Sequence, residues 1–122
     1  MSDTNDMSGT VLTRLYGNED YQKFGHCGVA NGYVGVFEGH PWYGVHYDDL
    51  TADGVYAHGG LSYSQMEDDG IRRPVWWVGF DTRHLGDNPA IHNWNYVGNE
   101  VRRLKDQALS ALSGREIYRW NP

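Results

Sequence analysis

Apolar residues spaced three and four positions apart mark the C-terminal part of the chain as helical. They recur at Val97, Val101, Leu104, Ala108 and Ala111 or Leu112. This period is typical of an amphipathic helix that packs one face on a core. Asn93 or Asn95 is suited to cap its start, and Gly114 predicts its end. The segment Arg115–Pro122 (REIYRWNP) is predicted as a last strand, with Ile117, Tyr118 and Trp120 docking on the rest of the fold.

Shorter apolar runs earlier in the chain indicate β structure. Val11–Tyr16 favours a first strand or a short helical turn, and Gly32–Glu38 is rich in β-branched and aromatic residues. Tyr43–Tyr47 and Val55–Tyr63 are further strand candidates. Val75–Phe80 (VWWVGF) does not alternate, which is typical of a strand covered on both faces. We therefore expect Val75–Phe80 at the sheet centre.

Together these elements predict an α+β fold in a single domain. The sheet is expected to be antiparallel or mixed, with one long C-terminal amphipathic helix packed on one face. Residues 1–10 are polar and without period, so a disordered N-terminal tail is expected before a domain at 11–122. Gly59-Gly60, inside one strand candidate, predicts a bulge or a close backbone approach.

Composition agrees with one small domain. The chain has 122 residues, of which 14% are aromatic, so a few large rings must supply much of the core. The longest apolar run is far shorter than the roughly 20 residues of a membrane helix, and no membrane insertion is expected. The N-terminal segment lacks the basic start and apolar stretch of a secretory signal, and Cys27 has no second cysteine to pair with. These features favour a cytoplasmic location, with Cys27 as a small buried filler.

Charge is unevenly distributed. The net charge is −6, but residues 1–69 hold 11 acids and 2 bases, whereas residues 70–122 hold 5 acids and 8 bases. Nucleic-acid binding depends on neutralising phosphates, so an acidic chain argues against a general nucleic-acid binder. The basic C-terminal part suits a solvated helix face or contact with an anionic ligand or acidic partner.

Histidines next to glycines and acids form the candidate chemistry. Asp81, His84 and Asp87 follow the apolar run at three-residue steps, and with His58 they could hold a divalent metal ion. Because loops at strand ends are where a sheet positions polar groups, we expect His58, Asp81 and His84 to lie around one surface cleft at the end of the strand Val75–Phe80. Histidine and carboxylate ligands with an open position are typical of hydrolytic zinc or iron sites. The alternative is structural, because Asp81 could cap a turn and Asp87 could start one. His40 and His46 are interpreted as structural.

A nucleophilic site is a weaker hypothesis. Cys27 follows His26, and Ser62 and Ser64 flank Tyr63, but sequence neighbours rarely reach the geometry that a nucleophile and its base require. The G-x-S-x-G motif is missing from the sequence. Ser62 stays a ligand-binding candidate.

Three segments together resemble a known family. They are Gly39–Gly44 (GHPWYG), His58–Ser64 (HGGLSYS) and Trp76–Asp87 (WWVGFDTRHLGD). The pattern H-G-G-L-(S/T)-Y-S followed by W-W-x-G-F-D-x-x-H-x-G-D resembles small proteins encoded mainly by tailed bacteriophages and prophages. The resemblance covers roughly residues 29–112. The family often has Cys where Thr82 stands, so no cysteine role carries over.

The resemblance implies a source and a setting, and no mechanism. It implies a phage-encoded accessory protein that acts in the cytoplasm of a bacterial host by binding a host protein or a small ligand. The alternative, from the residues, is a metal-dependent hydrolase that uses His58, Asp81, His84 and Asp87. The ligand-binding candidates are these four residues and Ser62. Whether the chain is an enzyme stays open at this point.

Overall fold

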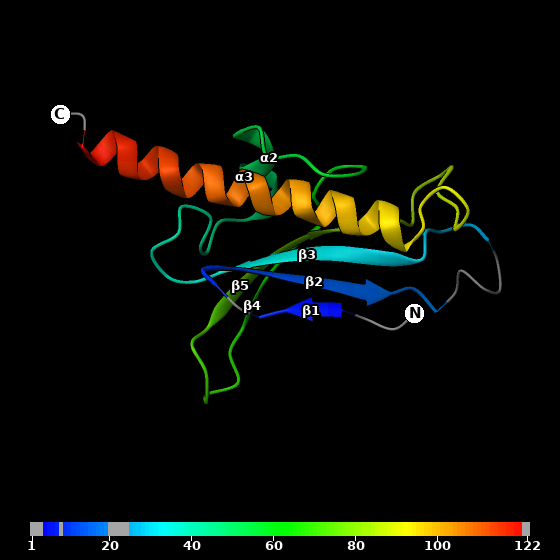
Figure 1. Cartoon of the computed structure of the whole chain (residues 1–122), viewed down its shortest axis with the longest axis horizontal. Helices are drawn as coiled ribbons and strands as arrows, with labels where there is room; N and C mark the ends of the chain where they lie inside the picture. The colour runs from blue at the N-terminus through cyan, green and yellow to red at the C-terminus, as the bar shows by residue number, and fades with distance from the viewer. Residues whose placement is uncertain (1–3, 8, 20–24, 121–122) are drawn as a thin grey trace.

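The computed structural model describes residues 4–7, 9–19 and 25–120. This part of the chain forms an open sheet of five antiparallel strands in the order β1-β2-β3-β5-β4. The elements are β1 (Thr4–Asp6), β2 (Val11–Gly17), β3 (Ala30–Val36), α2 (Tyr47–Ala52), β4 (Tyr63–Glu67), β5 (Val75–Phe80) and α3 (Trp94–Trp120). Both helices lie on the same face of the sheet, with α3 running along β2 and β3 (Figure 1). The predicted α+β fold with a long C-terminal helix on one face is confirmed.

The packing of α3 follows the apolar stripe in its sequence. Val97, Val101, Leu104 and Ala108 are at most 3% exposed and share one core cluster with apolar residues of β2, β3 and β5. Asn93 caps the helix, since its side-chain oxygen accepts a hydrogen bond from the Tyr96 N–H at 2.9 Å. The predicted helix face and one of the two predicted caps are therefore confirmed.

The end of α3 differs from the prediction. The helix continues through Gly114 to Trp120, so the predicted stop does not occur and Arg115–Trp120 is helical where a strand was predicted. Residues 121 and 122 lie outside the described part. Glycine costs about 1 kcal/mol in a helix interior but ends a helix only where the chain needs a left-handed turn. The expected docking of Ile117, Tyr118 and Trp120 lies outside the described side chains.

The opposite face of the sheet has a second, smaller core. Leu12, Val75 and Trp77 are buried there, with Tyr33 and Phe37 packed against them. The Arg14 guanidinium lies 4.0 Å from the Trp77 ring centroid and that of Arg73 lies 4.1 Å from the Phe37 ring centroid. Arginine side chains therefore cover apolar rings on this face, where the described residues place no helix.

Three further strand predictions need correction. β5 is an inner strand buried on both faces, as its sequence indicates, but the middle strand of the five is β3. Tyr43 and Gly44 lie in a turn, and Tyr47 is already the first residue of α2. His46 caps that helix, because its side chain accepts a hydrogen bond from the Asp48 N–H. Val55–Ser62 forms no strand, and the pairing begins only at Tyr63.

The N-terminal segment is partly structured. Residues 1–10 were expected to be a disordered tail, but Thr4–Asp6 forms β1 and pairs with Thr13–Leu15 of β2. Strand pairing supplies main-chain hydrogen bonds that a hydrophobicity pattern does not reveal. Residues 1–3 and 8 lie outside the described part.

Candidate functional site

The predicted histidine and aspartate residues converge beyond the end of β5. His58 lies in the loop between α2 and β4, whereas Asp81, His84 and Asp87 lie in the loop that joins β5 to α3. The imidazole rings of His58 and His84 are 5.6 Å apart between centroids. The expected convergence of His58, Asp81 and His84 is confirmed, and Asp87 lies at the centre of the group.

Asp87 is a buried carboxylate that joins two histidines. Its Oδ1 lies 2.8 Å from His58 Nε2, and its Oδ2 lies 3.0 Å from His84 Nδ1 and accepts the His84 backbone N–H at 2.9 Å. Burial raises the pKa of Asp87, but the hydrogen bonds from His84 and His58 outweigh it, so the pKa is below the ordinary value. The carboxylate is therefore ionised at neutral pH although only 6% of the residue is exposed.

Each histidine has a polar partner on its other nitrogen. His58 Nδ1 lies 2.8 Å from the Tyr96 hydroxyl in the first turn of α3. His84 Nε2 lies 3.6 Å from Asp81 Oδ1. Burial and the charges of Glu100 and Asp87 raise the pKa of Tyr96, so its phenol keeps its proton. These outer contacts fix the orientation of both rings.

Asp81 and Ser62 form the outer edge of the cluster. The Ser62 hydroxyl donates to Asp81 Oδ2 at 2.7 Å, and the Arg83 backbone N–H donates to Asp81 Oδ1 at 3.0 Å. The bond to Arg83 is the turn contact that the structural interpretation of Asp81 expected. Asp81 thus orients a turn and faces His84 at the same time.

Gly59 makes room for the His84 ring. Its φ is +69°, and a Cβ built on it would lie 2.4 Å from His84 Cε1. Gly60 follows with φ +93°, so two consecutive left-handed residues turn the chain away from a strand. The predicted close backbone approach at Gly59-Gly60 is therefore real, but it serves the histidine cluster and not a strand.

Two members of the cluster were missed by sequence reasoning. His92 Nδ1 lies 3.6 Å from Asp87 Oδ1 and accepts the Asn88 N–H at 3.1 Å, and the His92 and His58 ring centroids are 4.7 Å apart. Tyr96 contacts both rings. Both lie near the start of α3, and the capping signal at Asn93 could have placed them beside the preceding loop.

A buried polar network supports the base of the loop. Thr82 is fully buried, its hydroxyl donates to the Ala30 carbonyl at 2.7 Å, and it accepts from Asn18 Nδ2 at 3.1 Å. Asn31 Oδ1 accepts the Thr82 N–H at 3.1 Å. The Thr82 hydroxyl therefore fastens the start of the loop to β3 and to the segment after β2.

The remaining histidine, serine and cysteine candidates have structural roles. His40 is buried, with Nε2 2.8 Å from the Ala108 carbonyl oxygen, and His46 caps α2. Ser64 Oγ accepts the Tyr47 N–H at 3.1 Å. Cys27 is buried, as expected for a small core residue.

The donor atoms at the centre fit a metal ion. One ligand atom each from His58, His84 and Asp87 lies within 4.8 Å of the other two. Asp81, the fourth predicted ligand, faces His84 from outside this group of three. Two imidazoles and one carboxylate form a donor set that zinc and ferrous iron accept.

Comparisons with known proteins give no relative from which a function could be transferred to this chain. No protein-family model, curated protein or solved structure matches this chain. No helix in the described part of the chain combines the length and the apolar character that crossing a membrane requires.

Proposed function

We propose that the chain is a metal-dependent hydrolase that holds a divalent transition-metal ion at His58, His84 and Asp87. The observation that carries the proposal is the approach of these three donor groups to within 4.8 Å of one another. Three protein ligands leave a coordination position for water, and a bound metal lowers the pKa of that water toward about 7.

The contacts around the three ligands support this assignment. Metal-bound histidines usually donate the second ring N–H to a carboxylate, carbonyl or other polar group, which fixes the tautomer. Tyr96 stands at that position for His58, at 2.8 Å, and Asp81 faces His84 at 3.6 Å. The proton that Asp87 now shares with each ring would leave when the metal binds.

Access to the site is on the side of His84 and Asp81. Their side chains are 36% and 31% exposed, whereas the side chain of Asp87 is 5% exposed. A substrate would therefore meet the site at His84, with Ser62 and Asp81 available for hydrogen bonds.

Metal titration tests the proposal directly. Protein stripped with a chelator is titrated with Zn²⁺ by calorimetry, together with the variants His58→Ala and His84→Ala. Each variant is expected to weaken zinc binding more than about tenfold. Loss of a residue that only contacts a metal ligand already costs about 10–100-fold in affinity, and loss of the ligand itself should cost more. The control is His46→Ala, which removes an exposed histidine outside the cluster. Unchanged zinc affinity in both cluster variants would overturn the metal site.

Hydrolysis is tested separately. The zinc-loaded protein is assayed with bis(p-nitrophenyl) phosphate and p-nitrophenyl acetate, and with His84→Ala as the background. A metal-dependent rate above that background supports the hydrolase, and zinc binding without such a rate on either probe limits the proposal to metal binding.

A second candidate function is binding of a bacterial host protein, which the family resemblance implies. The specific observation is the sheet face on which the described residues place no helix, where Tyr63 is exposed and Arg73 lies over Phe37. Aromatic residues and arginine are enriched among the residues that dominate protein interfaces. Expression in a bacterial host discriminates the two: loss of a growth effect in Tyr63→Ser but not in His84→Ala favours the binder, and the reverse favours the enzyme.

A further inference from the structure

Tyrosine side chains gather on the open face of the sheet, which is the face where the described residues place no helix. Tyr33 belongs to the small core of this face together with Leu12 and Trp77. Side chains alternate between the two faces along a strand. Tyr16 is four residues beyond Leu12 on β2, and Tyr63 of β4 pairs with the residue two beyond Trp77 on β5, so both share the open face.

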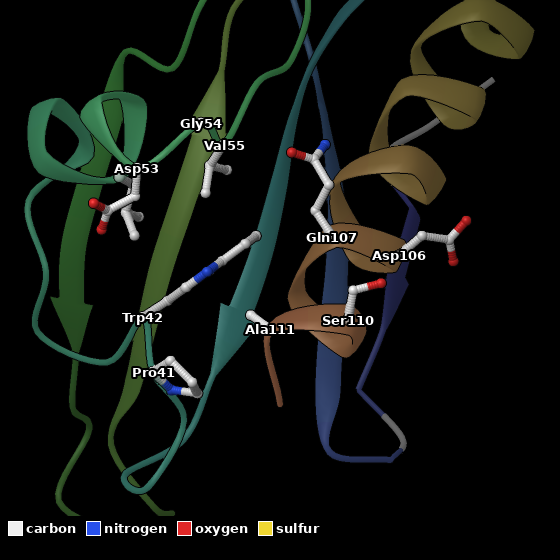
Figure 2. Close-up of a pocket in the computed structure, with 10 residues that line it drawn as sticks. Pro41, Trp42, Asp53, Gly54, Val55, Asp106, Gln107, Ser110 and Ala111 are labelled. Atoms are coloured by element: carbon white, nitrogen blue, oxygen red, sulfur yellow. The ribbon is translucent and has the colours of Figure 1, made fainter. Parts of the chain in front are cut away.

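The tyrosines of the open face are accessible, unlike a large aromatic residue of the opposite, covered face. Figure 2 shows the covered face, where a cavity between α2 and α3 is lined by Trp42, Val55 and Ala111. Even beside this cavity Trp42 is only 4% exposed, whereas Tyr16 is 58% and Tyr63 is 37% exposed. Exposed aromatic side chains grouped on one face are typical of a binding surface.

The tyrosine rings extend across four neighbouring strands. The ring centroids of Tyr33 and Tyr63 are 5.2 Å apart. Gly79 lies between them in the register, and a Cβ on it would clash with the Tyr33 ring, so the missing side chain lets the two rings meet. Tyr16 pairs with Asn31, two residues before Tyr33, and such diagonal neighbours lie roughly 7–8 Å apart. From β2 to β4 the rings span roughly 14 Å at the usual strand spacing, which suits an extended ligand.

Polar groups border the rings where the open face meets the histidine cluster. Asp81 directly follows β5, two residues beyond Gly79, and its side chain is 31% exposed. Its Oδ2 accepts the hydroxyl of Ser62, the residue before Tyr63, at 2.7 Å. Burial raises the pKa of Tyr33, and the charge of Asp81 raises it further, so the phenol keeps its proton and can donate. The surface therefore offers a carboxylate acceptor and hydroxyl groups beside aromatic rings.

The charges of the open face disfavour an anionic ligand. The guanidinium of Arg14 lies over Trp77 and is already held by both carboxylate oxygens of Glu67, at 3.0 and 3.2 Å. Asp81 would repel a phosphate, and the net charge of the chain is −6. Binding of a nucleic acid depends on cations that neutralise its phosphates. An uncharged ligand rich in hydroxyl groups fits this surface better.

We propose that Tyr16, Tyr33, Tyr63 and Asp81 form a binding site for a neutral oligosaccharide. The C–H groups on the face of a sugar ring are apolar and gain from leaving water against the tyrosine rings. Sugar hydroxyls donate to the Asp81 carboxylate in charge-assisted hydrogen bonds. Asp81 also faces His84 at 3.6 Å, so a bound sugar chain would reach toward the proposed metal centre. Binding of the sugar does not require the metal.

Titration of the zinc-free intact chain, followed by ¹H–¹⁵N correlation NMR, tests this site apart from the metal centre. The probes are maltotriose, cellotriose and tri-N-acetylchitotriose, which are uncharged and differ in linkage or substituents. We expect saturable shifts at the amides of Tyr33, Tyr63 and Asp81 with at least one probe, and an affinity that added salt leaves unchanged. No saturable shift with any probe, or shifts confined to other regions, would overturn the proposal.

Variants of exposed tyrosines test whether the rings themselves hold the sugar. Tyr16→Ala and Tyr63→Ala are each expected to weaken binding of the best probe about tenfold. Tyr56→Ala is the matched control, because Tyr56 is 64% exposed and lies in the loop after α2, where its backbone bonds to Gln107 of α3. Tyr16 is the more exposed of the two test positions, so its variant keeps the test valid if Tyr63→Ala is unstable. An affinity of Tyr16→Ala equal to that of the control would contradict the site.

A thymidine trinucleotide determines whether the rings bind sugars or bases. Its bases stack on aromatic side chains, and its phosphates carry the negative charge that the oligosaccharides lack. Binding weaker than that of the best oligosaccharide supports the proposal. Binding as tight or tighter would overturn it and identify the open face as a surface for single-stranded nucleic acid.

Discussion

The interface between α3 and the sheet and the cluster around Asp87 both bury side chains, but by opposite means. The α3 interface excludes water with residues such as Leu104 and Val97, and its contribution to stability comes from the apolar surface area that it buries. The cluster buries a charged carboxylate and retains it only because two histidines and a backbone N–H contact it. The first region therefore stabilises the fold, whereas the second holds groups that can do chemistry.

The largest expected effect is at the helix interface. Leu104→Ala should lower the free energy of unfolding by about 2–5 kcal/mol, because it leaves a cavity in the main core. Leu109, on the same helix but 37% exposed, is the matched control, and its change to Ala should cost far less. Chemical denaturation of both variants measures the difference. Equal stabilities for the two would show that the helix face is not the source of fold stability.

The next effect is at the polar support beneath the cluster. Thr82→Val should destabilise the fold by about 1–3 kcal/mol, because Asn18 and the Ala30 carbonyl each lose a buried hydrogen-bond partner. Thr51→Val removes an exposed hydroxyl that bonds within α2 and is the control. A Thr82→Val protein as stable as the parent would contradict the structural role of this network.

The two glycines separate backbone strain from contact with the histidine. Ala at either position 59 or 60 places a side chain at positive φ, which costs about 1 kcal/mol or more. Only at Gly59 would the new Cβ also meet the His84 ring. Gly59→Ala should therefore weaken zinc binding as well as stability, whereas Gly60→Ala should reduce stability alone. Calorimetry measures the zinc affinity and thermal unfolding measures the stability of the same samples. Equal zinc affinities for the two variants would contradict the contact between position 59 and His84.

The smallest expected effect is a pH dependence from Asp87. Its pKa is lower in the folded chain than the value of about 3.9 expected in the unfolded chain. Its contribution to stability is therefore fully present above about pH 4 and is lost as the pH falls through the folded-state pKa. Glu67 and Asp69 also have lowered pKa values, so only the difference from Asp87→Asn isolates this group. Melting temperatures between pH 2 and 7 should converge for parent and variant at the acidic end.

The same contrast explains what could be predicted from sequence. The stripe on α3 and the buried strand at Val75–Phe80 are local patterns, and the structure confirms them. The convergence of His58 with Asp81 and His84 was expected from loops at strand ends, because a sheet brings such loops together.

The features that the sequence did not predict depend on contacts between residues distant in the chain or on the shape of a turn. β1 forms through pairing with β2, and His92 reaches Asp87 through a turn whose shape depends on Asn88 and Gly86. The false strand at Val55–Tyr63 had the right residue types, but two left-handed glycines redirected the backbone toward His84.

The short strand β1 also affects how copies of the chain meet one another. It pairs with Thr13–Leu15 of β2. Without β1, β2 would be the edge strand at this end of the sheet. A long uncovered edge is a template for pairing with another molecule. Removal of residues 1–9 should therefore leave β2, seven residues long, as an unpaired edge strand. We expect the shortened protein to fold and to self-associate through this edge.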